Sequence, residues 1–213
     1  MTLIDDAWLM DIAAGNAPRA VAAMARAQER LRPELAGRRE AGEAVFGAWL
    51  DDLAPERLRA DALRRALDES MAVVSPGPEP HAPLPRSIAR LVKDASAIDR
   101  LDWRLRYRAL SHIALPTLDE PGVEARLLRL EPGGAIPAHG HDGEELTLVL
   151  SGGFEDGRGV YRRGDVCAAD ADTAHRPQVS DPEPCVCFTV TLGRRRFRNP
   201  LIAAADRMLG GLI

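Results

Sequence analysis

Between residues 1 and 74, apolar side chains recur every three to four positions, which is the spacing of amphipathic helices. A first helix is predicted around Ile12. Asn16 is suited to cap a second helix, because its side chain can accept a hydrogen bond from a free backbone amide, and Pro18 would lie just inside that helix. The second helix should continue to about Leu31.

Two more helices are expected in the same segment. The third would begin at Pro33, and its apolar stripe consists of Ala41, Val45, Trp49 and Leu53, with Phe46 and Leu50 beside them. The fourth would follow Pro55, and its apolar side consists of Leu58, Ala62, Leu63, Ala66, Leu67 and Met71. Four short helices enclose only a thin core, so we expect such a unit to expose apolar surface when it is alone.

A proline-rich stretch comes next. The eleven residues from Ser75 to Pro85 contain five prolines, which favours an extended and semi-rigid chain. We therefore predict a linker over residues 75–86, with a domain boundary between residues 1–74 and 87–213. His81 lies in this stretch and is expected to be solvated.

From residue 87 onward the pattern favours strands. Short alternating segments end at turn signals such as Pro121-Gly122 and Asp156-Gly157, which is typical of a sandwich or barrel. In one of them Glu145, Thr147 and Val149 alternate with Leu146, Leu148 and Leu150. Residues 200–209 are predicted to form a short final helix. The expected fold class is α+β with two domains, a small helical bundle followed by an all-β domain.

Three of the five histidines and one glutamate occur at spacings that suit a single metal ion. His139 and His141 are two residues apart, so both rings leave the same face of an extended strand. Asp142-Gly143 is a turn signal, and Glu145 opens the next strand. His175 follows 30 residues after Glu145, where it is placed to close the fourth side.

This set of ligands limits the choice of metal without fixing it. Three imidazoles and one carboxylate suit zinc, iron, manganese, nickel or cobalt. The alternative is that the four residues are the remnant of a site that no longer holds metal. Their joint spacing, together with the glycines around them, favours one divalent transition metal per chain.

The cysteines lie in the same half of the chain. Their odd number, three, argues against a secreted disulfide scaffold. Cys185 and Cys187 share one face of a predicted strand, where a disulfide between them would be strained. Two interpretations remain open for this pair, either small buried hydrophobic residues or a redox-active dithiol. Cys167 is expected to fill the core.

Composition and charge exclude several classes of function. The 213 residues carry a formal net charge of −4, which gives no general attraction to nucleic acid or anionic membranes. No apolar run reaches the roughly 18 residues of a membrane span, and the N-terminus lacks a basic signal segment, so a cytoplasmic protein is expected. Residues 1–74 contain 13 Asp and Glu against 10 Arg, a net charge of 10 − 13 = −3, which suits a basic protein partner better than DNA.

The pattern around the histidines resembles a known family. Residues 133–152 resemble the first cupin motif throughout, and residues 164–175 resemble the second. The second motif retains Gly164 and His175, whereas Asp170, Asp172 and Val179 stand where cupins have proline, glycine and often asparagine. The resemblance implies a jelly-roll barrel with the metal held inside.

The order of the parts extends the resemblance to nearly the whole chain. A helical module, a proline-rich linker and a cupin together resemble the ChrR group of anti-sigma factors. The likeness is carried by Leu9–Gly15, Asp102–Arg104, His139–Leu150 and Cys185–Cys187, and it is most specific in the cupin half.

This resemblance implies a partner and a signal. The helical domain would sequester an ECF-type (extracytoplasmic-function) sigma factor, and the cupin would sense oxidative stress, either singlet oxygen or organic peroxide, and promote release. Zinc becomes the preferred metal, and a homodimer formed through the barrel is compatible with the family. One property departs from the family: its helical domain typically binds a second zinc through His and Cys, and residues 1–80 contain neither.

Other classes of function fit the same barrel. Cupins with this ligand set also include metal-dependent enzymes such as dioxygenases, and ligand-binding regulators. The helical module could serve only for dimerisation. No base besides Glu144 stands out, and Arg126, Arg129, Arg162 and Arg176 suit the surface as well as a substrate. We therefore expect sequestration of a sigma factor rather than catalysis.

Overall fold

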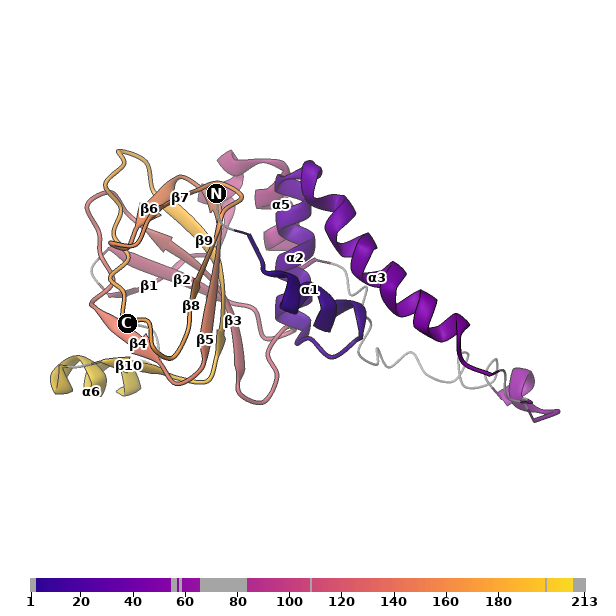
Figure 1. Cartoon of the computed structure of the whole chain (residues 1–213). Coiled ribbons are helices and arrows are strands. Elements are labelled where there is room, and N and C mark those ends of the chain that lie inside the picture. Colours follow the sequence, from indigo (N-terminus) through magenta and orange to yellow (C-terminus); the bar gives the residue numbers. More distant parts are fainter. Residues whose placement is uncertain are drawn as a thin grey trace.

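The computed structural model describes residues 3–54, 57, 59–65, 84–107, 109–197 and 199–208. A β-barrel forms one end of the molecule and helices form the other (Figure 1). Most of the expected fourth helix and of the predicted linker lies outside the described residues, although residues 62–65 are helical. The division into domains at residues 75–86 therefore stays a prediction.

Three N-terminal helices form where the apolar spacing predicts them. They are α1 (Asp6–Ala13), α2 (Arg19–Leu31) and α3 (Ala36–Asp51), the last preceded by a 3-10 turn, η1 (Pro33–Leu35). The Asp5 side chain caps α1 by accepting a hydrogen bond from the Trp8 amide at 2.8 Å. α2 is alanine-rich and buried on most of its surface, which is expected of a helix enclosed by other elements.

The start of α2 differs from the prediction. Asn16 does not cap it; Pro18 occupies the capping position and no side chain of that segment caps the helix. Instead, the Glu120 carboxylate accepts from the Arg19 amide at 3.0 Å, 101 residues away in sequence. A tertiary contact thus satisfies the free amide that a local cap would have served.

A helical segment also precedes the strands, which begin later than predicted. Residues 87–102 were expected to belong to the strand region, but they hold α5 (Arg86–Lys93) and the 3-10 helix η2 (Ala95–Arg100). Ile88 and Leu91 of α5 are fully buried. Their three-residue spacing is a helical signal, but eight residues beside a proline-rich stretch are too few to make it stand out from the sequence.

The barrel is built on a six-stranded antiparallel sheet of order β1-β2-β3-β9-β5-β8. These strands are β1 (Arg104–Tyr107), β2 (Leu110–Ala114), β3 (Val123–Leu130), β9 (Cys185–Leu192), β5 (Glu144–Ser151) and β8 (Val166–Ala169). Two small antiparallel pairs close it, β4 (His139–His141) with β10 (Arg195–Phe197) and β6 (Gly153–Glu155) with β7 (Val160–Arg162). The last helix, α6 (Pro200–Met208), lies where the sequence predicted it. The expected α+β class is confirmed.

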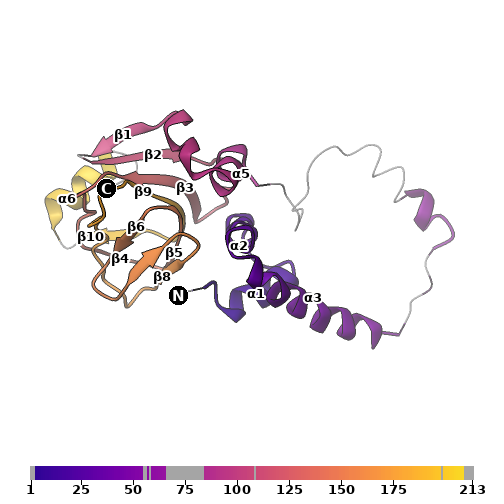
Figure 2. The same cartoon turned by 90° about the horizontal axis from the view of Figure 1, so that it is seen from above.

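The large sheet is covered on both faces. Its outer face packs against α2 and α5 in one continuous hydrophobic cluster that includes Leu146, Leu148, Leu150, Val186, Phe188 and Val190. Its inner face carries the alternate residues of β5 and β9, including Glu145, Thr147, Cys185 and Cys187. α2 lies between the barrel and the α1–α3 pair (Figure 2).

Buried polar contacts fasten the helices to the turn between β7 and β8. The Gln28 amide of α2 accepts from the Ile4 N–H at 3.2 Å and donates to the Gly164 carbonyl at 2.9 Å. Arg32 forms an ion pair with Asp165 at 3.0 Å, and Arg163 donates to the Val92 carbonyl at the end of α5 at 2.8 Å. Gly164 has φ +88°, a left-handed conformation that favours glycine, and an added Cβ would also displace the Arg32 side chain.

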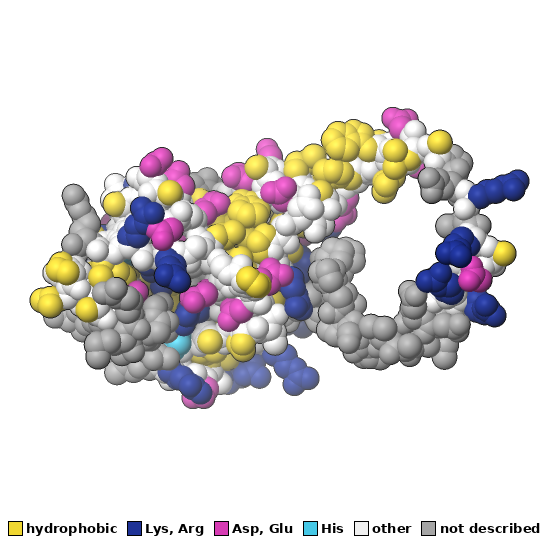
Figure 3. Space-filling model, turned by 90° about the horizontal axis from the view of Figure 1, so that it is seen from below, with side chains coloured by type: hydrophobic (Ala, Val, Ile, Leu, Met, Phe, Trp, Pro, Cys, Tyr) yellow, Lys and Arg dark blue, Asp and Glu magenta, His cyan; other side chains and the backbone are white. Residues whose placement is uncertain are grey.

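α3 extends away from the body of the molecule (Figure 1). It crosses α1 at Gly42, the residue of α3 that is buried, where an added Cβ would meet the Ala13 Cβ at 3.5 Å. Beyond the crossing, Val45, Trp49 and Leu50 of α3 are 43 % to 66 % exposed, as is Leu53 just after the helix. Hydrophobic side chains gather along this helix in Figure 3. Within the described residues, no helix has the length and apolar character needed to cross a membrane.

Candidate metal site

Four side chains converge inside one end of the barrel, as the sequence spacing predicts. His139 and His141 come from β4, Glu145 from β5 and His175 from the segment between β8 and β9. The candidate ligand atoms all lie within 4.8 Å of one another. The His175 Nε2 atom lies 3.1 Å from the His139 Nε2 and 3.3 Å from the His141 Nε2, and 3.8 Å from the Glu145 Oε1.

Backbone contacts hold these residues in place. β4 pairs with β10, so that His141 lies opposite Arg195 and His139 lies opposite Phe197. His139 and His175 exchange two backbone hydrogen bonds, of 3.0 and 2.9 Å, which carry the distant His175 to the site. The turn that joins β4 to β5 passes close to β9, and a Cβ on Gly143 would collide with the Leu192 carbonyl. The Asp142-Gly143 turn therefore needs its glycine.

The three imidazoles are held in their neutral form. Burial lowers the pKa of His139 to about 3. Burial also lowers the pKa of His141 and of His175, although the Glu145 carboxylate opposes the effect in both cases. Neutral imidazole is the form that binds metal, so these rings are ready to act as ligands without first losing a proton.

Glu145 is buried and ionised. Burial is the largest single effect and would raise its pKa, but the Arg195 guanidinium and the three nearby histidines together outweigh it, and the pKa falls to about 2. Arg195 Nε donates to Glu145 Oε2 at 2.9 Å, and the Thr191 hydroxyl donates to the same oxygen at 3.2 Å. The other carboxylate oxygen, Oε1, is the one that lies nearest to His175.

A second carboxylate lies behind His175. Asp156 Oδ2 is 3.4 Å from His175 Nδ1, a distance that is long for a hydrogen bond, and the Asp156 side chain is fully buried. Arg158 donates to Asp156 Oδ2 at 2.8 Å and to the Cys167 sulfur at 3.1 Å. The carboxylate of Asp156, the thiol of Cys167 and the imidazole of His175 could also hold a metal. However, the Arg158 guanidinium already supplies a positive charge at that position.

Sequence reasoning missed these supporting residues. Asp156 was interpreted only as part of a turn, and nothing in the sequence pointed to Arg158, Thr191 or Arg195. Arg195 lies on a three-residue strand that was not predicted, 50 residues after the glutamate that it contacts. No local spacing connects two residues so far apart.

The arrangement fits a divalent transition metal. The His175 Nε2 atom lies 3.1 and 3.3 Å from the Nε2 atoms of His139 and His141, and an ionised carboxylate faces the same space. Nitrogen lone pairs at such distances gain from a shared cation, and a His₃Glu set is a ligand set that such metals accept. This buried group could therefore bind a metal.

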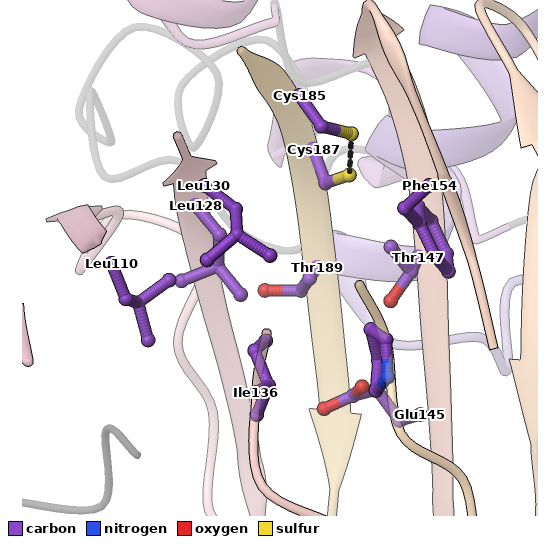
Figure 4. A pocket seen from close by; sticks show the side chains of 11 residues that line it. Leu110, Leu128, Leu130, Ile136, Glu145, Thr147, Phe154, Cys185, Cys187 and Thr189 are labelled. Carbon is purple, nitrogen blue, oxygen red and sulfur yellow. Dashed lines mark hydrogen bonds between the residues drawn. The ribbon is translucent and has the colours of Figure 1, made fainter. Parts of the chain in front are cut away.

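A small cavity adjoins the site. It has room for about 30 Å³ and is lined mainly by apolar side chains of the inner face, with Glu145 at one end and the two thiols of Cys185 and Cys187 at the other (Figure 4). The two sulfur atoms are 3.5 Å apart, and both cysteines are buried and free. The hydrogen bond with Cys185 and burial raise the pKa of the Cys187 thiol well above its usual range.

The fold and site define a cupin-like barrel preceded by helices. Residues 93–193 match the family described as the ChrR Cupin-like domain. The chain is 31 % identical over 203 residues to the anti-sigma-E factor ChrR of Cereibacter sphaeroides, covering 92 % of each protein. It therefore belongs to the ChrR family of anti-sigma factors, as the sequence motifs indicated.

A solved structure supports the same assignment. The chain resembles a structure described as Rhodobacter sphaeroides SigE in complex with the anti-sigma ChrR, with a TM-score of 0.71 and 32 % identity. The match covers 90 % of this chain and 98 % of the other. The similarity thus includes helices as well as the barrel.

Proposed function

We propose that this protein sequesters an ECF-type sigma factor through α1 and α3, and that its barrel holds one divalent transition metal, preferably zinc, in a sensor of oxidative stress. The observation that carries the proposal is similarity over nearly the full chain to ChrR, whose solved structure is a complex with SigE. The metal ligands would be His139, His141, Glu145 and His175.

The exposed stripe of α3 supports the choice of docking surface. α2 is engaged with the sheet, which leaves α1 and α3 as the N-terminal helices that face outward (Figure 2). Phe46 and Trp49 pack edge to face, with ring centroids 5.2 Å apart, and two exposed aliphatic residues of α3, Val45 and Leu50, lie on the same helix. Aromatic and aliphatic groups of this size on an extended helix are typical of the centre of a protein interface.

The missing N-terminal zinc is compatible with this role. A structural zinc substitutes for a core that a small domain lacks. Here the fully buried Val21, Ala23 and Met24 of α2 belong to the same hydrophobic cluster as the outer face of the sheet and α5. The barrel therefore gives the helices the packing that a metal would otherwise supply.

The sensing part of the proposal rests on the barrel interior. An oxidant in the cavity would lie between the metal ligand Glu145 and the thiols of Cys185 and Cys187. A peroxide would oxidise one thiol to a sulfenic acid and be reduced to an alcohol, and singlet oxygen would attack imidazole or thiol directly. Either product adds bulk and polarity beneath the sheet on which α2 packs. The alternative is that Cys185 and Cys187 are only small buried core residues and take no part in sensing.

Binding of sigma factors tests the sequestration role. The full-length protein should bind one of the ECF sigma factors of its own organism in isothermal titration calorimetry. Trp49→Ser should weaken binding at least about tenfold, because truncation of a central aromatic residue costs more than about 1.4 kcal/mol. Leu201→Ser, which changes a residue 79 % exposed on α6, is the control and should not matter. Failure of the wild-type protein to bind any of these sigma factors would refute the proposal. A stable dimer that Trp49→Ser dissolves would instead assign α3 to self-association.

Metal content tests the site. The purified protein should contain about one equivalent of a transition metal by mass spectrometry of the elements, and His139→Ala or His175→Ala should remove it. Protein that purifies without metal and takes up none on titration would contradict the assignment.

A further inference from the structure

The Arg195 guanidinium lies within hydrogen-bonding distance of the Glu145 carboxylate at the candidate metal site. Arg195 approaches Glu145 Oε2 through both Nε and Nη2, each at 2.9 Å, and Nη2 also donates to the Thr191 hydroxyl at 3.3 Å. The Arg195 side chain is only 9 % exposed, and that of Glu145 is 6 % exposed. The pair is therefore an inner, hydrogen-bonded ion pair rather than a surface contact.

The guanidinium is fixed to the site by its strand. β10 pairs with β4, so Arg195 lies opposite His141, while the Phe197 ring lies 5.6 Å from the His139 ring. One short strand thus carries both a cation for the carboxylate and a cover for an imidazole. Its position is set by the same backbone pairing that places two of the candidate ligands.

We propose that Arg195 is a resident counter-cation of this site, which shares Glu145 with the metal and thereby weakens metal binding. The inference rests on the proposed function, because it assumes that the four residues bind a metal. Arg195 already compensates the negative charge of Glu145 before a metal binds, so a divalent ion gains less electrostatic stabilisation from the carboxylate. The ion also experiences repulsion from the nearby guanidinium. In an interior that screens charge poorly, such a repulsion is large compared with its effect in water.

The two carboxylate oxygens have separate roles in this arrangement. Oε2 is occupied by Arg195 and Thr191, and Oε1 faces His175 Nε2. Glu145 is thereby limited to one oxygen as a metal ligand. When the metal leaves, Arg195 compensates the charge of the buried carboxylate, so loss of metal does not leave an uncompensated anion in the barrel. The site is thus suited to release its metal without collapse.

Removal of the charge tests the proposal in an unusual direction. Arg195→Gln retains a hydrogen-bond donor for Oε2 but removes the positive charge. The variant should bind zinc at least about tenfold more tightly than the wild-type protein in chelator competition. After removal of metal, it should melt at a lower temperature than the metal-free wild-type protein. A purely structural role for Arg195 would lower both stability and affinity, as loss of an outer partner of a ligand typically does.

The neighbouring residue provides a matched control. Arg196 is on the same strand with a side chain 66 % exposed and pairs with Asp142, so Arg196→Gln removes an equal charge outside the site and should leave zinc affinity unchanged. Arg195→Lys retains the charge and should stay within a few-fold of wild type. If Arg195→Gln does not fold, the Arg195 Nε–H resonance of the ¹⁵N-labelled wild-type protein provides the test. The resonance should be present without metal and shift on zinc addition.

Each result supports or overturns the inference. If the wild-type protein binds zinc and the Arg195→Gln variant binds it equally well or more weakly, the proposed role of Arg195 is refuted, but the metal site is not. Zinc binding by neither protein would refute the metal site and the inference with it. An Nε–H resonance that does not respond to zinc would also overturn it.

Discussion

Gln28 offers a sharp test of how the helices and the barrel depend on each other. Its amide joins three separate segments, because it accepts from Ile4 near the N-terminus and donates to Gly164 in the turn between β7 and β8. Gln28 is 3 % exposed, and both partners are buried. Gln28→Leu preserves the approximate volume of the side chain and removes both hydrogen bonds.

The expected cost follows from the two backbone groups that lose their partner. An unsatisfied buried donor or acceptor costs about 1 to 3 kcal/mol, so the two together should reduce the free energy of unfolding by about 2 to 6 kcal/mol. For a chain of this size each kcal/mol lowers the melting temperature by roughly 2 to 4 °C, which gives a decrease of at least about 4 °C.

Urea denaturation followed by circular dichroism and by tryptophan fluorescence would measure the change. Trp8 lies in the helices and Trp103 next to the sheet, so a single transition for both signals would show that helices and barrel unfold together. Gln178→Leu is the control, since Gln178 is only half-buried and its amide donates to Glu155 at 2.7 Å. A Gln28→Leu variant within about 0.5 kcal/mol of wild type would show that the buried amide contributes nothing to the attachment of α2.

Three further results are expected. The metal-free protein should lose stability as the pH falls from about 6.5 to about 3. Burial lowers the pKa of His139 to about 3, so in this range the unfolded chain binds a proton that the folded chain does not. Melting curves across this range would test the prediction, and His139→Gln should give a flatter profile. Asp156→Asn should weaken zinc binding by about 10- to 100-fold by removing the carboxylate behind His175, and Asp181→Asn, on the barrel surface, should not. The thiols of the folded, unstressed protein should resist iodoacetamide until urea is added. Burial raises the pKa of Cys167 to about 12, and the pKa of Cys187 is also raised, so little reactive thiolate is present. Rapid labelling of native protein would show that the cavity opens.

The sequence predicted those parts of the molecule that local periodicity controls. His139, His141 and Glu145 fall within seven residues, so strand geometry and one turn bring them together, and the alternation in β5 correctly separated Glu145 from the leucines. The start of α2 could not be predicted, because Glu120, which is remote in sequence, replaces the local cap. The roles of Arg195 and Asp156 could not be predicted for the same reason. Their contacts with the site depend on how distant strands pair, and neither charge nor composition indicates that pairing.

The two faces of β5 also constrain how this chain can change over evolutionary time. The strand carries Glu145 inside the barrel and carries Leu146, Leu148 and Leu150 toward α2 and α5. Deletion of a single residue within β5 would exchange these faces along the strand, aim leucines at the imidazoles and place a carboxylate against the helices. Only changes of two residues at a time preserve both faces. A lineage cannot remodel the candidate metal ligand and the helix-packing surface separately by insertion or deletion here, so the two are inherited as one unit.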